Sequence, residues 1–352
     1  MNRSLTIGQH TITDDGDCYV IAEIGHNHQG SLEKAKALFH AAKECGADAV
    51  KLQKRDNRAL YTRAMYDKPY DNENSFGSTY GAHREALEFG WDEYVELQRY
   101  ASELGLDLSA TAFDLPSADF LNRLDISSFK IASGDVRNVP LLTHVAKFQR
   151  PVIMSTGGAT LDDVRRAYDT VMPINPRFCI LQCTAAYPAD PEEINLRVIT
   201  TYRNTFPKAT VGLSDHYNGI AMAVAAYALG ARVIEKHFTL NHTWKGTDHA
   251  FSLEPEGFRK IVRDLRRGRV ALGDGVKRVY ASEANAILKM GKTLVAGRKL
   301  PVGHVLTTDD IAIKSPGGGL PPFELPRLIG RRLAKAVDTD EAILLTHLDG
   351  AA

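Results

Sequence analysis

The chain has 352 residues, with 43 Lys and Arg against 43 Asp and Glu, so its formal net charge is +0. A hydrophobic fraction of 44% and a charged fraction of 24% are typical of a globular protein that buries a full core without structural disulfides or metals. The balanced charge argues against a nucleic-acid partner, and the absence of an apolar run of membrane-spanning length argues against a membrane partner.

Eight short apolar strands, each leading into a helical pattern or a polar loop, are predicted in chain order. They span residues 20–25, 47–53, 106–113, 128–133, 151–156, 178–184, 210–216 and 232–239. Eight strand–helix units in about 250 residues match the (β/α)8 TIM barrel in number and length. An open, doubly wound sheet is the alternative, because alternation of strands and helices does not by itself require closure.

Several helix boundaries can be predicted from capping residues. Ser31 is expected to cap a helix that stops at Gly46, and residues 220–231 fit a buried crossover helix. Asp190 precedes a proline and two glutamates, which is a strong helix-start pattern. Thr160 begins a weaker version of the same pattern.

Two stretches depart from the strand–helix repeat. Residues 55–90 are rich in Tyr, Asn, Asp and Gly, and we interpret them as a long inserted loop over one end of the barrel. After residue 275 the pattern changes to short β-like runs with Gly and Pro turns, among them 293–295, 312–314 and 333–336. We therefore predict a barrel domain over 1–275, a linker over 276–292 and a small domain over 293–352.

The cysteines predict a reduced environment. Cys18, Cys45, Cys179 and Cys183 are too few and too scattered for a disulfide framework, and no CxxC pair indicates a zinc site. The first 17 residues are polar and lack an apolar targeting core. We therefore predict a cytoplasmic enzyme or binding protein.

Polar residues recur at the carboxyl ends of the predicted strands, where TIM barrels place their active sites. They are Glu23, Lys51, Gln53, Thr111, Lys130, Ser133, Ser155, Thr184, Ser214, His216, Glu235 and His237. Any one of them could be a satisfied polar group above the barrel core. Their recurrence on nearly every strand favours a functional site, because unpaired polar groups in a barrel interior are destabilising.

His216 and His237 end the last two strands, so they could converge on one metal ion. With Glu235 nearby, two imidazoles would leave open positions for substrate and water. A histidine in a strand is more often part of a hydrogen-bonded scaffold, so both interpretations stay open from these residues alone.

Lys51 and Lys130 offer two positive charges to one cavity, and the turn after Ser155 precedes a helix whose backbone N–H groups could hold a phosphate. Together they favour a small phosphorylated anion as a substrate. The alternative is that the lysines only pair with Glu23 or Glu235. No hydrolase triad or P-loop is present: Ser214-Asp215-His216 are merely adjacent, and no Lys-Ser/Thr follows the glycines at 317–319.

Six motifs, in order along the chain, resemble the N-acetylneuraminate (sialic acid) synthase family, which includes legionaminate and pseudaminate synthases. They are AEIGHNHQG at 22–30, VKLQ at 50–53, FKIAS at 129–133, MSTG at 154–157, GLSDH at 212–216 and EKHFT at 235–239. The segment from Thr293 resembles the antifreeze-like (SAF, β-clip) domain of this family.

The resemblance implies a transferase that condenses phosphoenolpyruvate with an N-acylated hexosamine, such as N-acetylmannosamine, with or without a 6-phosphate. The products would be a nine-carbon 2-keto sugar acid and phosphate. It implies that His216 and His237 ligate a divalent ion, commonly Mn²⁺, with Mg²⁺ or Co²⁺ as alternatives.

The resemblance also assigns substrate contacts. Phosphoenolpyruvate would be held by Lys51, Lys130, Ser133, Ser155 and Ser214. Sugar or water would be contacted by Glu23, Gln53, Tyr187, Glu235 and Asp248, with Thr111 and Phe113 lining the pocket and Asn74 or Asn72 reaching in from the inserted stretch. Glu23 or Glu235 would manage the proton of a water that adds to phosphoenolpyruvate.

Two positions differ from the family pattern. Ala185 stands where many relatives have Asn, and Ser315 stands where many bacterial relatives have an Arg that reaches the sugar from the partner subunit of a domain-swapped homodimer. The loss of this bidentate donor favours an acceptor other than plain N-acetylmannosamine.

Two other functions remain open from the sequence. One is a Schiff-base aldolase on the same barrel, with Lys51, Lys130 or Lys236 as the amine. The other is a non-catalytic sugar-binding protein that uses the SAF domain.

Overall fold

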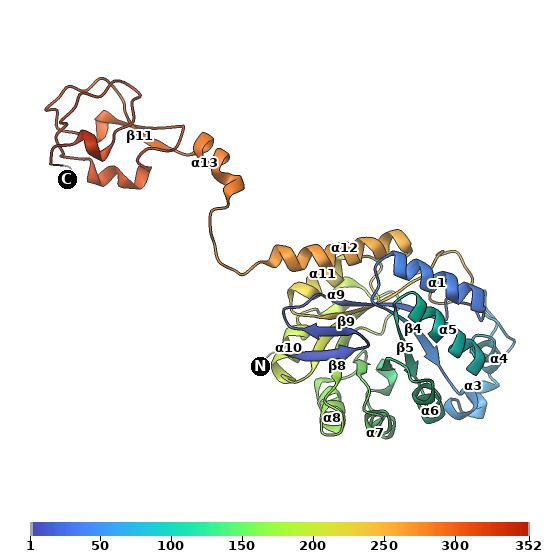
Figure 1. Ribbon diagram of the computed structural model, residues 1–352. Helices are drawn as coiled ribbons and strands as arrows, with labels where there is room; N and C mark the ends of the chain where they lie inside the picture. Colours follow the sequence, from blue (N-terminus) through green and yellow to red (C-terminus); the bar gives the residue numbers. More distant parts are fainter. Residues whose placement is uncertain (1–2, 351–352) are drawn as a thin grey trace. The chain divides into compact units, whose positions relative to one another are not determined.

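The computed structural model describes residues 3–350 and divides the chain into two compact units, with the boundary between Gly273 and Asp274. The first unit is a closed barrel of eight parallel strands with helices around it (Figure 1), which confirms the predicted TIM barrel. The second unit is small and contains a two-stranded antiparallel sheet. Within the described range, no helix combines the length and apolar character needed to cross a membrane.

All eight predicted strands are present, with ends that differ from the predictions by a few residues. They are β3 (Tyr19–Gly25), β4 (Ala49–Lys54), β5 (Asp107–Ala112), β6 (Ser128–Ile131), β7 (Val152–Ser155), β8 (Phe178–Cys183), β9 (Thr210–Asp215) and β10 (Val233–His237). Their spatial order follows the chain, and β10 closes the ring by pairing with β3. Every carboxyl end therefore opens on the same side of the barrel.

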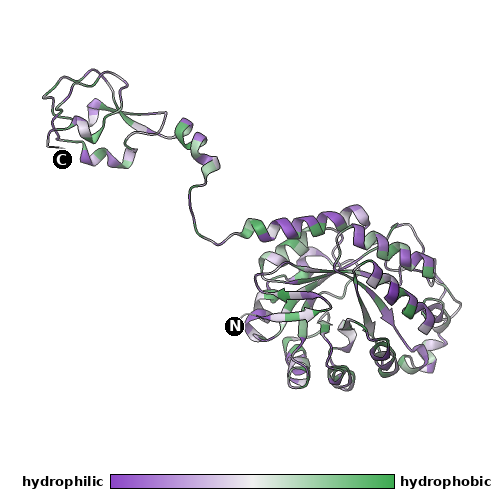
Figure 2. Cartoon of the chain, in the orientation of Figure 1, coloured by the Kyte–Doolittle hydropathy of each residue, from purple (hydrophilic) through white to green (hydrophobic). Residues whose placement is uncertain are grey.

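The helices around the barrel are α1 (Leu32–Glu44), α5 (Trp91–Glu103), α6 (Leu115–Leu124), α7 (Val139–Lys147), α8 (Leu161–Val171), α9 (Pro191–Ile194), α10 (Val198–Thr205), α11 (Ala221–Ala228) and α12 (Pro255–Leu272). Hydrophilic and hydrophobic residues alternate along them (Figure 2), as in amphipathic helices that cover a sheet. Their apolar faces share one core with the outward side chains of the strands.

The helix caps agree only partly with the predictions. Ser31 accepts a hydrogen bond from the Lys34 N–H and caps α1 as expected. Asp190 makes no side-chain capping bond, and α9 lasts one turn before Asn195 turns left-handed at φ 45°. The weaker pattern at Thr160 instead forms a reciprocal capping box with Asp163 at the start of α8.

The inserted stretch contains more structure than the predicted loop. It holds three short helices, α2 (Asn57–Leu60), α3 (Arg63–Tyr66) and α4 (Tyr80–Glu85). The N-caps Asp56, Thr62 and Thr79 each accept a backbone hydrogen bond, which explains why helical turns form in so polar a segment.

An N-terminal hairpin fills the amino-terminal end of the barrel. Its strands, β1 (Ser4–Ile7) and β2 (His10–Thr13), pair antiparallel and were not predicted. The side chains of Leu5, Ile7 and Ile12 are buried against inward-facing residues of the barrel strands. The core is thus closed at the end opposite the carboxyl ends of the strands.

The second unit contains β11 (Thr293–Ala296), β12 (Ile311–Lys314) and its own small leucine-rich core. The predicted runs 293–295 and 312–314 form these two strands. The predicted run at 333–336 was wrong as a strand, because it contributes only the isolated bridge between Leu333 and Leu348. The segment predicted as a linker includes the helix α13 (Ala284–Met290).

Candidate active site

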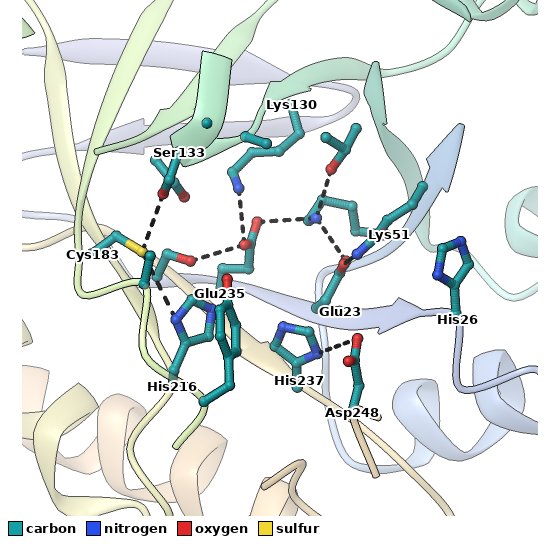
Figure 3. Close-up of a pocket in the computed structure, with 18 of the residues that line it drawn as sticks. Glu23, His26, Lys51, Lys130, Ser133, Cys183, His216, Glu235, His237 and Asp248 are labelled. Atoms are coloured by element: carbon teal, nitrogen blue, oxygen red, sulfur yellow. Dashed lines mark hydrogen bonds and ion pairs between the residues drawn. The ribbon is translucent and has the colours of Figure 1, made fainter. Parts of the chain in front are cut away.

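A cavity of about 330 Å³ opens at the carboxyl ends of the barrel strands (Figure 3). Most residues predicted for the site line it; Thr184 and the two alternatives Asn72 and Asn74 do not. Those that line it are Glu23, Lys51, Gln53, Thr111, Phe113, Lys130, Ser133, Ser155, Tyr187, Ser214, His216, Glu235, His237 and Asp248. The roles that the resemblance gives to these residues stay predictions.

The register of the parallel strands brings these side chains to the same level. Glu23 pairs with Lys51 on one side and with His237 on the other, and Glu235 pairs with Ser214. Gly212 permits the close approach of β9 and β10, because a Cβ there would lie 2.2 Å from the Val233 carbonyl oxygen. The periodicity of two in each strand then directs alternate side chains into the barrel.

Two lysines and two glutamates form a buried network in the floor of the cavity. Lys51 Nζ lies 2.7 Å from Glu23 Oε2 and 3.7 Å from Glu235 Oε2, and Lys130 Nζ lies 3.0 Å from Glu235 Oε1. Each of these four side chains is at most 5% exposed. The lysines therefore do pair with the glutamates, the alternative that the sequence left open.

The network separates the pKa values of its two carboxyl groups. Burial raises the pKa of Glu23, and nearby Glu235 adds to the rise. Burial acts in the same direction on Glu235, but Lys130 and Lys51 outweigh it and lower the pKa of Glu235 to about 2. Glu235 is therefore a fixed negative charge between two ammonium groups, whereas Glu23 is the carboxylate better able to accept a proton.

One side of the cavity presents hydrogen-bond donors suited to an anion. The buried Ser155 hydroxyl has no hydrogen-bond partner within residues 3–350. Ser133 Oγ accepts from the Gly157 N–H at 2.9 Å in the turn after β7. Lys130 reaches the same region, and burial lowers its pKa. An unpartnered buried hydroxyl in a cavity that an ammonium group also lines indicates that an anionic oxygen would bind there.

His216 and His237 meet at the ends of β9 and β10, with ring centroids 5.4 Å apart. Burial is the main cause that lowers the pKa of each to about 4, so both imidazoles are neutral at pH 7. His216 Nδ1 lies 2.8 Å from the Thr184 carbonyl oxygen. That bond places the proton on Nδ1 and leaves the Nε2 lone pair free to bind a metal ion.

The side chains around His216 and His237 provide some, but not all, of the ligands that a divalent ion needs. No group of three or more His, Cys, Asp and Glu side chains within the described range is arranged as a ready metal site. Two neutral imidazoles are present, however, and buried His237 Nδ1 has no hydrogen-bond partner within that range and lies 3.7 Å from Asp248 Oδ2. Two histidines with open positions beside them are compatible with a catalytic divalent ion.

Tyr187 covers the histidine pair at the cavity mouth. Its ring centroid lies 4.2 Å from that of His216 and 5.3 Å from that of Phe251. The side chain is 55% exposed, so it is positioned to close over a ligand. The neighbouring Ala185 also lines the cavity, where an Asn would have added a polar contact.

Asn74 does not line the cavity. Its amide oxygen accepts a hydrogen bond of 2.9 Å from the Gly246 N–H, beside the lining residues Thr247 and Asp248. A direct contact between Asn74 and the sugar stays a prediction. Ser315 lies in the second unit, where its hydroxyl accepts a hydrogen bond of 2.6 Å from Lys292 Nζ.

Among the lining residues that were not predicted as site residues, three have basic side chains: His26, Arg55 and Arg84. Arg55 continues the alternation of Lys51 and Gln53 on the same face, a signal present in the sequence. His26 lies within a quoted motif. Arg84 comes from α4 in the inserted stretch, where no strand or helix pattern in the sequence indicates that its side chain faces the cavity.

The fold and the cavity define a TIM-barrel enzyme that binds an anionic substrate at the carboxyl ends of its strands. A family model described as the NeuB family matches residues 38–277, and one described as the SAF domain matches residues 291–349. The chain therefore belongs to the NeuB family and carries a C-terminal SAF domain.

Individual relatives agree with this assignment. The chain is 44% identical to N-acetylneuraminate-9-phosphate synthase of Homo sapiens, over 97% of this chain and 94% of that protein. It is 36% identical to N,N'-diacetyllegionaminic acid synthase of Legionella pneumophila, over 94% and 95% respectively. A solved structure of N-acetylneuraminic acid synthetase from Leptospira borgpetersenii has a TM-score of 0.71 and 31% identity, over 82% and 96%. The predicted family and enzyme class, the phosphoenolpyruvate-dependent nonulosonate synthases, are confirmed.

Proposed function

We propose that the enzyme condenses phosphoenolpyruvate with an N-acylated hexosamine, giving a nine-carbon 2-keto sugar acid and inorganic phosphate. The observation that carries this proposal is the buried network of Glu23, Lys51, Lys130 and Glu235 in a cavity that is also lined by Ser155, whose hydroxyl has no partner among the described residues. The name of the human relative describes a 9-phosphate, so acceptor sugars with and without a phosphate on carbon 6 both belong to the proposal.

Phosphoenolpyruvate would bind deep in the cavity. Lys51 and Lys130 would offset its charge, and the hydroxyls of Ser133, Ser155 and Ser214 would donate to its oxygens. Because both ammonium groups are already held by carboxylates, they are fixed before the substrate arrives. Such fixed donors stabilise developing charge without reorganising during the reaction.

The acceptor would lie above phosphoenolpyruvate, with its aldehyde toward the histidines and contacts from Gln53, Tyr187 and Asp248. Thr111 and Phe113 line the wall between the two substrates. Asn74 would reach the sugar only after releasing its bond to Gly246.

The chemical step forms one carbon–carbon bond and one carbon–oxygen bond, and it breaks the carbon–oxygen bond to phosphate. Carbon 3 of phosphoenolpyruvate attacks the aldehyde carbon of the sugar, and water adds to carbon 2. Glu23 accepts the proton of that water, consistent with its raised pKa. Glu235 stays ionised and stabilises positive character at carbon 2. Phosphate then leaves with the oxygen that joined it to carbon 2. The new hydroxyl on carbon 2 gives up its proton to become the ketone, and the former aldehyde oxygen takes up a proton to become a hydroxyl.

His216 and His237 would hold the divalent ion, which we propose to be Mn²⁺, with Mg²⁺ and Co²⁺ as alternatives of similar coordination chemistry. When bound, such an ion supplies Lewis-acid polarisation of the aldehyde oxygen. The Thr184 carbonyl fixes the His216 ring for this role, and the Asp248 carboxylate lies beside the His237 ring.

We also propose a domain-swapped homodimer, with 276–292 acting as the linker to the SAF domain. Exposed apolar side chains along this stretch support a partner: Val276, Val279, Tyr280, Ile287, Leu288 and Met290. A cytoplasmic location fits the four buried, unoxidised cysteines.

The proposal is tested with full-length enzyme, phosphoenolpyruvate, Mn²⁺ and a panel of amino sugars with and without a 6-phosphate. We expect phosphate release matched by a nine-carbon keto acid in mass spectra. Phosphoenolpyruvate labelled with oxygen-18 in its bridging oxygen should give labelled phosphate.

Two results would contradict the proposal. Phosphate release with no sugar on the panel, despite added metal, would instead support a sugar-binding protein. Trapping of a lysine adduct by borohydride, together with insensitivity to chelators, would support the Schiff-base aldolase.

A further inference from the structure

A second group of cationic side chains lines the cavity, separate from the lysine–glutamate network. It consists of Arg55 and Arg84, one on either side of the His26 ring. In Figure 3, His26 lies beyond Glu23, on the opposite side of the cavity from Ser133 and Cys183. The cavity therefore has two cationic ends.

Arg55 is almost completely buried, with 7% of its surface exposed. Its NH2 group donates to Gln53 Oε1 at 2.7 Å, and its guanidinium lies 3.8 Å from the centroid of the Phe113 ring. Its Nε has no hydrogen-bond partner within residues 3–350. The nearest carboxylate, Glu88, is 3.8 Å away and lies closer to Lys54, at 3.2 Å. Arg55 thus keeps an unused donor and an incompletely balanced charge.

Arg84 forms no ion pair with a carboxylate among the described residues, although burial, which lowers its pKa, is outweighed by Tyr80, Tyr61 and the more distant Asp248, which raise it. Its Nε and NH2 groups donate to the Tyr80 hydroxyl at 3.0 and 2.9 Å. Among the described residues, no carboxylate oxygen lies within 4.0 Å of its guanidinium. A half-buried guanidinium without a carboxylate partner is unusual unless a ligand completes its environment.

The His26 ring cannot satisfy both arginines. Arg55 NH1 lies 3.0 Å from its Nε2, and Arg84 NH1 lies 3.2 Å from its Nδ1. Burial, followed by the two arginines, holds the pKa of His26 well below its usual range, so the ring is neutral. A neutral imidazole has one acceptor nitrogen and one N–H. One guanidinium therefore faces a donor, and the cluster lacks at least one acceptor.

We propose that Arg55 and Arg84 form a specificity site for a phosphate group on the acceptor sugar, so that the preferred acceptor is an N-acylated hexosamine 6-phosphate. The fork geometry of guanidinium groups matches phosphate oxygens, which would accept from Arg55 Nε and from the arginine that His26 cannot satisfy. The position, across the cavity from Ser133, leaves the other cationic end to phosphoenolpyruvate. This inference rests on the proposed function.

The test compares Arg84→Gln, Arg84→Lys and wild type with N-acetylmannosamine 6-phosphate and N-acetylmannosamine as acceptors. The readout is the ratio of kcat/KM for the phosphorylated acceptor to kcat/KM for the unphosphorylated one. Loss of charge-assisted hydrogen bonds to phosphate predicts that Arg84→Gln lowers this ratio about 10- to 100-fold, mainly through KM for the phosphorylated sugar. Arg84→Lys should lower it less, because it keeps a charge but not the fork.

A merely structural role for Arg84 would lower activity on both acceptors alike and leave the ratio unchanged, which would overturn the inference. The inference would also be overturned if Arg84→Gln raised KM for phosphoenolpyruvate and left KM for the phosphorylated acceptor unchanged. The control is Arg99→Gln, a surface residue that is 62% exposed and pairs with Glu103 on α5, for which the ratio should equal that of wild type.

Failure of the inference is distinguishable from failure of the proposed function. Wild-type turnover of N-acetylmannosamine without preference for its 6-phosphate would refute the phosphate site alone. Absence of phosphate release with either sugar would refute the proposed function. Calorimetric titration of N-acetylmannosamine 6-phosphate into wild type and Arg84→Gln provides a second readout, and equal affinities would also count against the site.

Discussion

Lys130 and Glu235 form an ion pair that crosses the interior of the barrel. Their side chains meet at 3.0 Å, although β6 and β10 occupy opposite positions in the ring of eight strands. Both side chains are at most 5% exposed, so the contact is shielded from solvent. This pair ties the two sides of the barrel together at the floor of the cavity and fixes a positive charge where an anionic substrate would bind.

Lys130→Met should reduce both stability and activity. It leaves the buried Glu235 carboxylate with Lys51 at 3.7 Å as its remaining ion-pair partner and a hydrogen bond of 3.1 Å from the Ser214 hydroxyl, and we expect a loss of about 3 kcal/mol in the free energy of unfolding. Turnover should fall at least about 100-fold through loss of the fixed charge. The double variant Lys130→Met/Glu235→Gln should regain stability in urea denaturation but not activity. A double variant no more stable than the single one would show that the pair is not the cause.

His216→Ala and His237→Ala should each abolish metal-dependent turnover while leaving the fold intact. Removing a direct ligand is expected to weaken Mn²⁺ binding by at least about 100-fold, as measured by calorimetry or electron paramagnetic resonance. Circular dichroism should match that of wild type. His40→Ala, at a side chain that is 56% exposed on α1, is the control. Unchanged Mn²⁺ affinity in either active-site variant would remove the metal assignment.

Asp310 should make the stability of the second unit depend on pH. Its carboxylate is fully buried. Burial alone would raise its pKa, but hydrogen bonds from His304, Thr307 and Arg298 outweigh that effect and hold the pKa below its usual range. The stabilisation is therefore complete above about pH 4, the unfolded pKa of Asp, and is lost as the pH falls through the folded pKa.

Asp310→Asn should accordingly destabilise the second unit by about 2 kcal/mol at pH 7, and the difference from wild type should shrink as the pH falls below about 4. Urea denaturation at several pH values measures this difference. Asp338→Asn, at a carboxylate that is 70% exposed and pairs with Lys299, serves as the control and should have little effect. A difference between Asp310→Asn and wild type that stayed constant down to pH 2 would contradict the assignment.

Ile7→Ala should destabilise the barrel, although Ile7 does not line the cavity. Ile7 is fully buried in the core that the hairpin shares with the barrel strands. Truncation should cost about 2–4 kcal/mol of unfolding free energy. Thr6→Ala, on the opposite face of β1, should cost far less. Equal effects of the two substitutions in thermal denaturation would mean that the hairpin does not pack against the barrel.

The barrel strands could be predicted because each is a short apolar run bounded by polar residues and turns, and the order of strands around a TIM barrel follows the chain. Their polar ends then indicated the cavity. The hairpin at residues 4–13 was missed because its four-residue strands bury only Leu5, Ile7 and Ile12 in an otherwise polar segment.

Other parts of the site depend on tertiary contacts that no local pattern records. Arg84 reaches the cavity only because α4 folds over the barrel end, and its meeting with His26 joins residues 58 positions apart. The two helix starts at Asp190 and Thr160 show the same dependence on tertiary contacts. The stronger capping pattern at Asp190 forms no side-chain capping bond, whereas the weaker one at Thr160 forms a capping box.

The hairpin closes the amino-terminal end of the barrel and so determines the side from which ligands reach the cavity. Since Leu5, Ile7 and Ile12 occupy that end, ligands reach the cavity from the side of the carboxyl ends of the strands. Closure of one end by a short hairpin thereby makes substrates and products share the same end of the barrel.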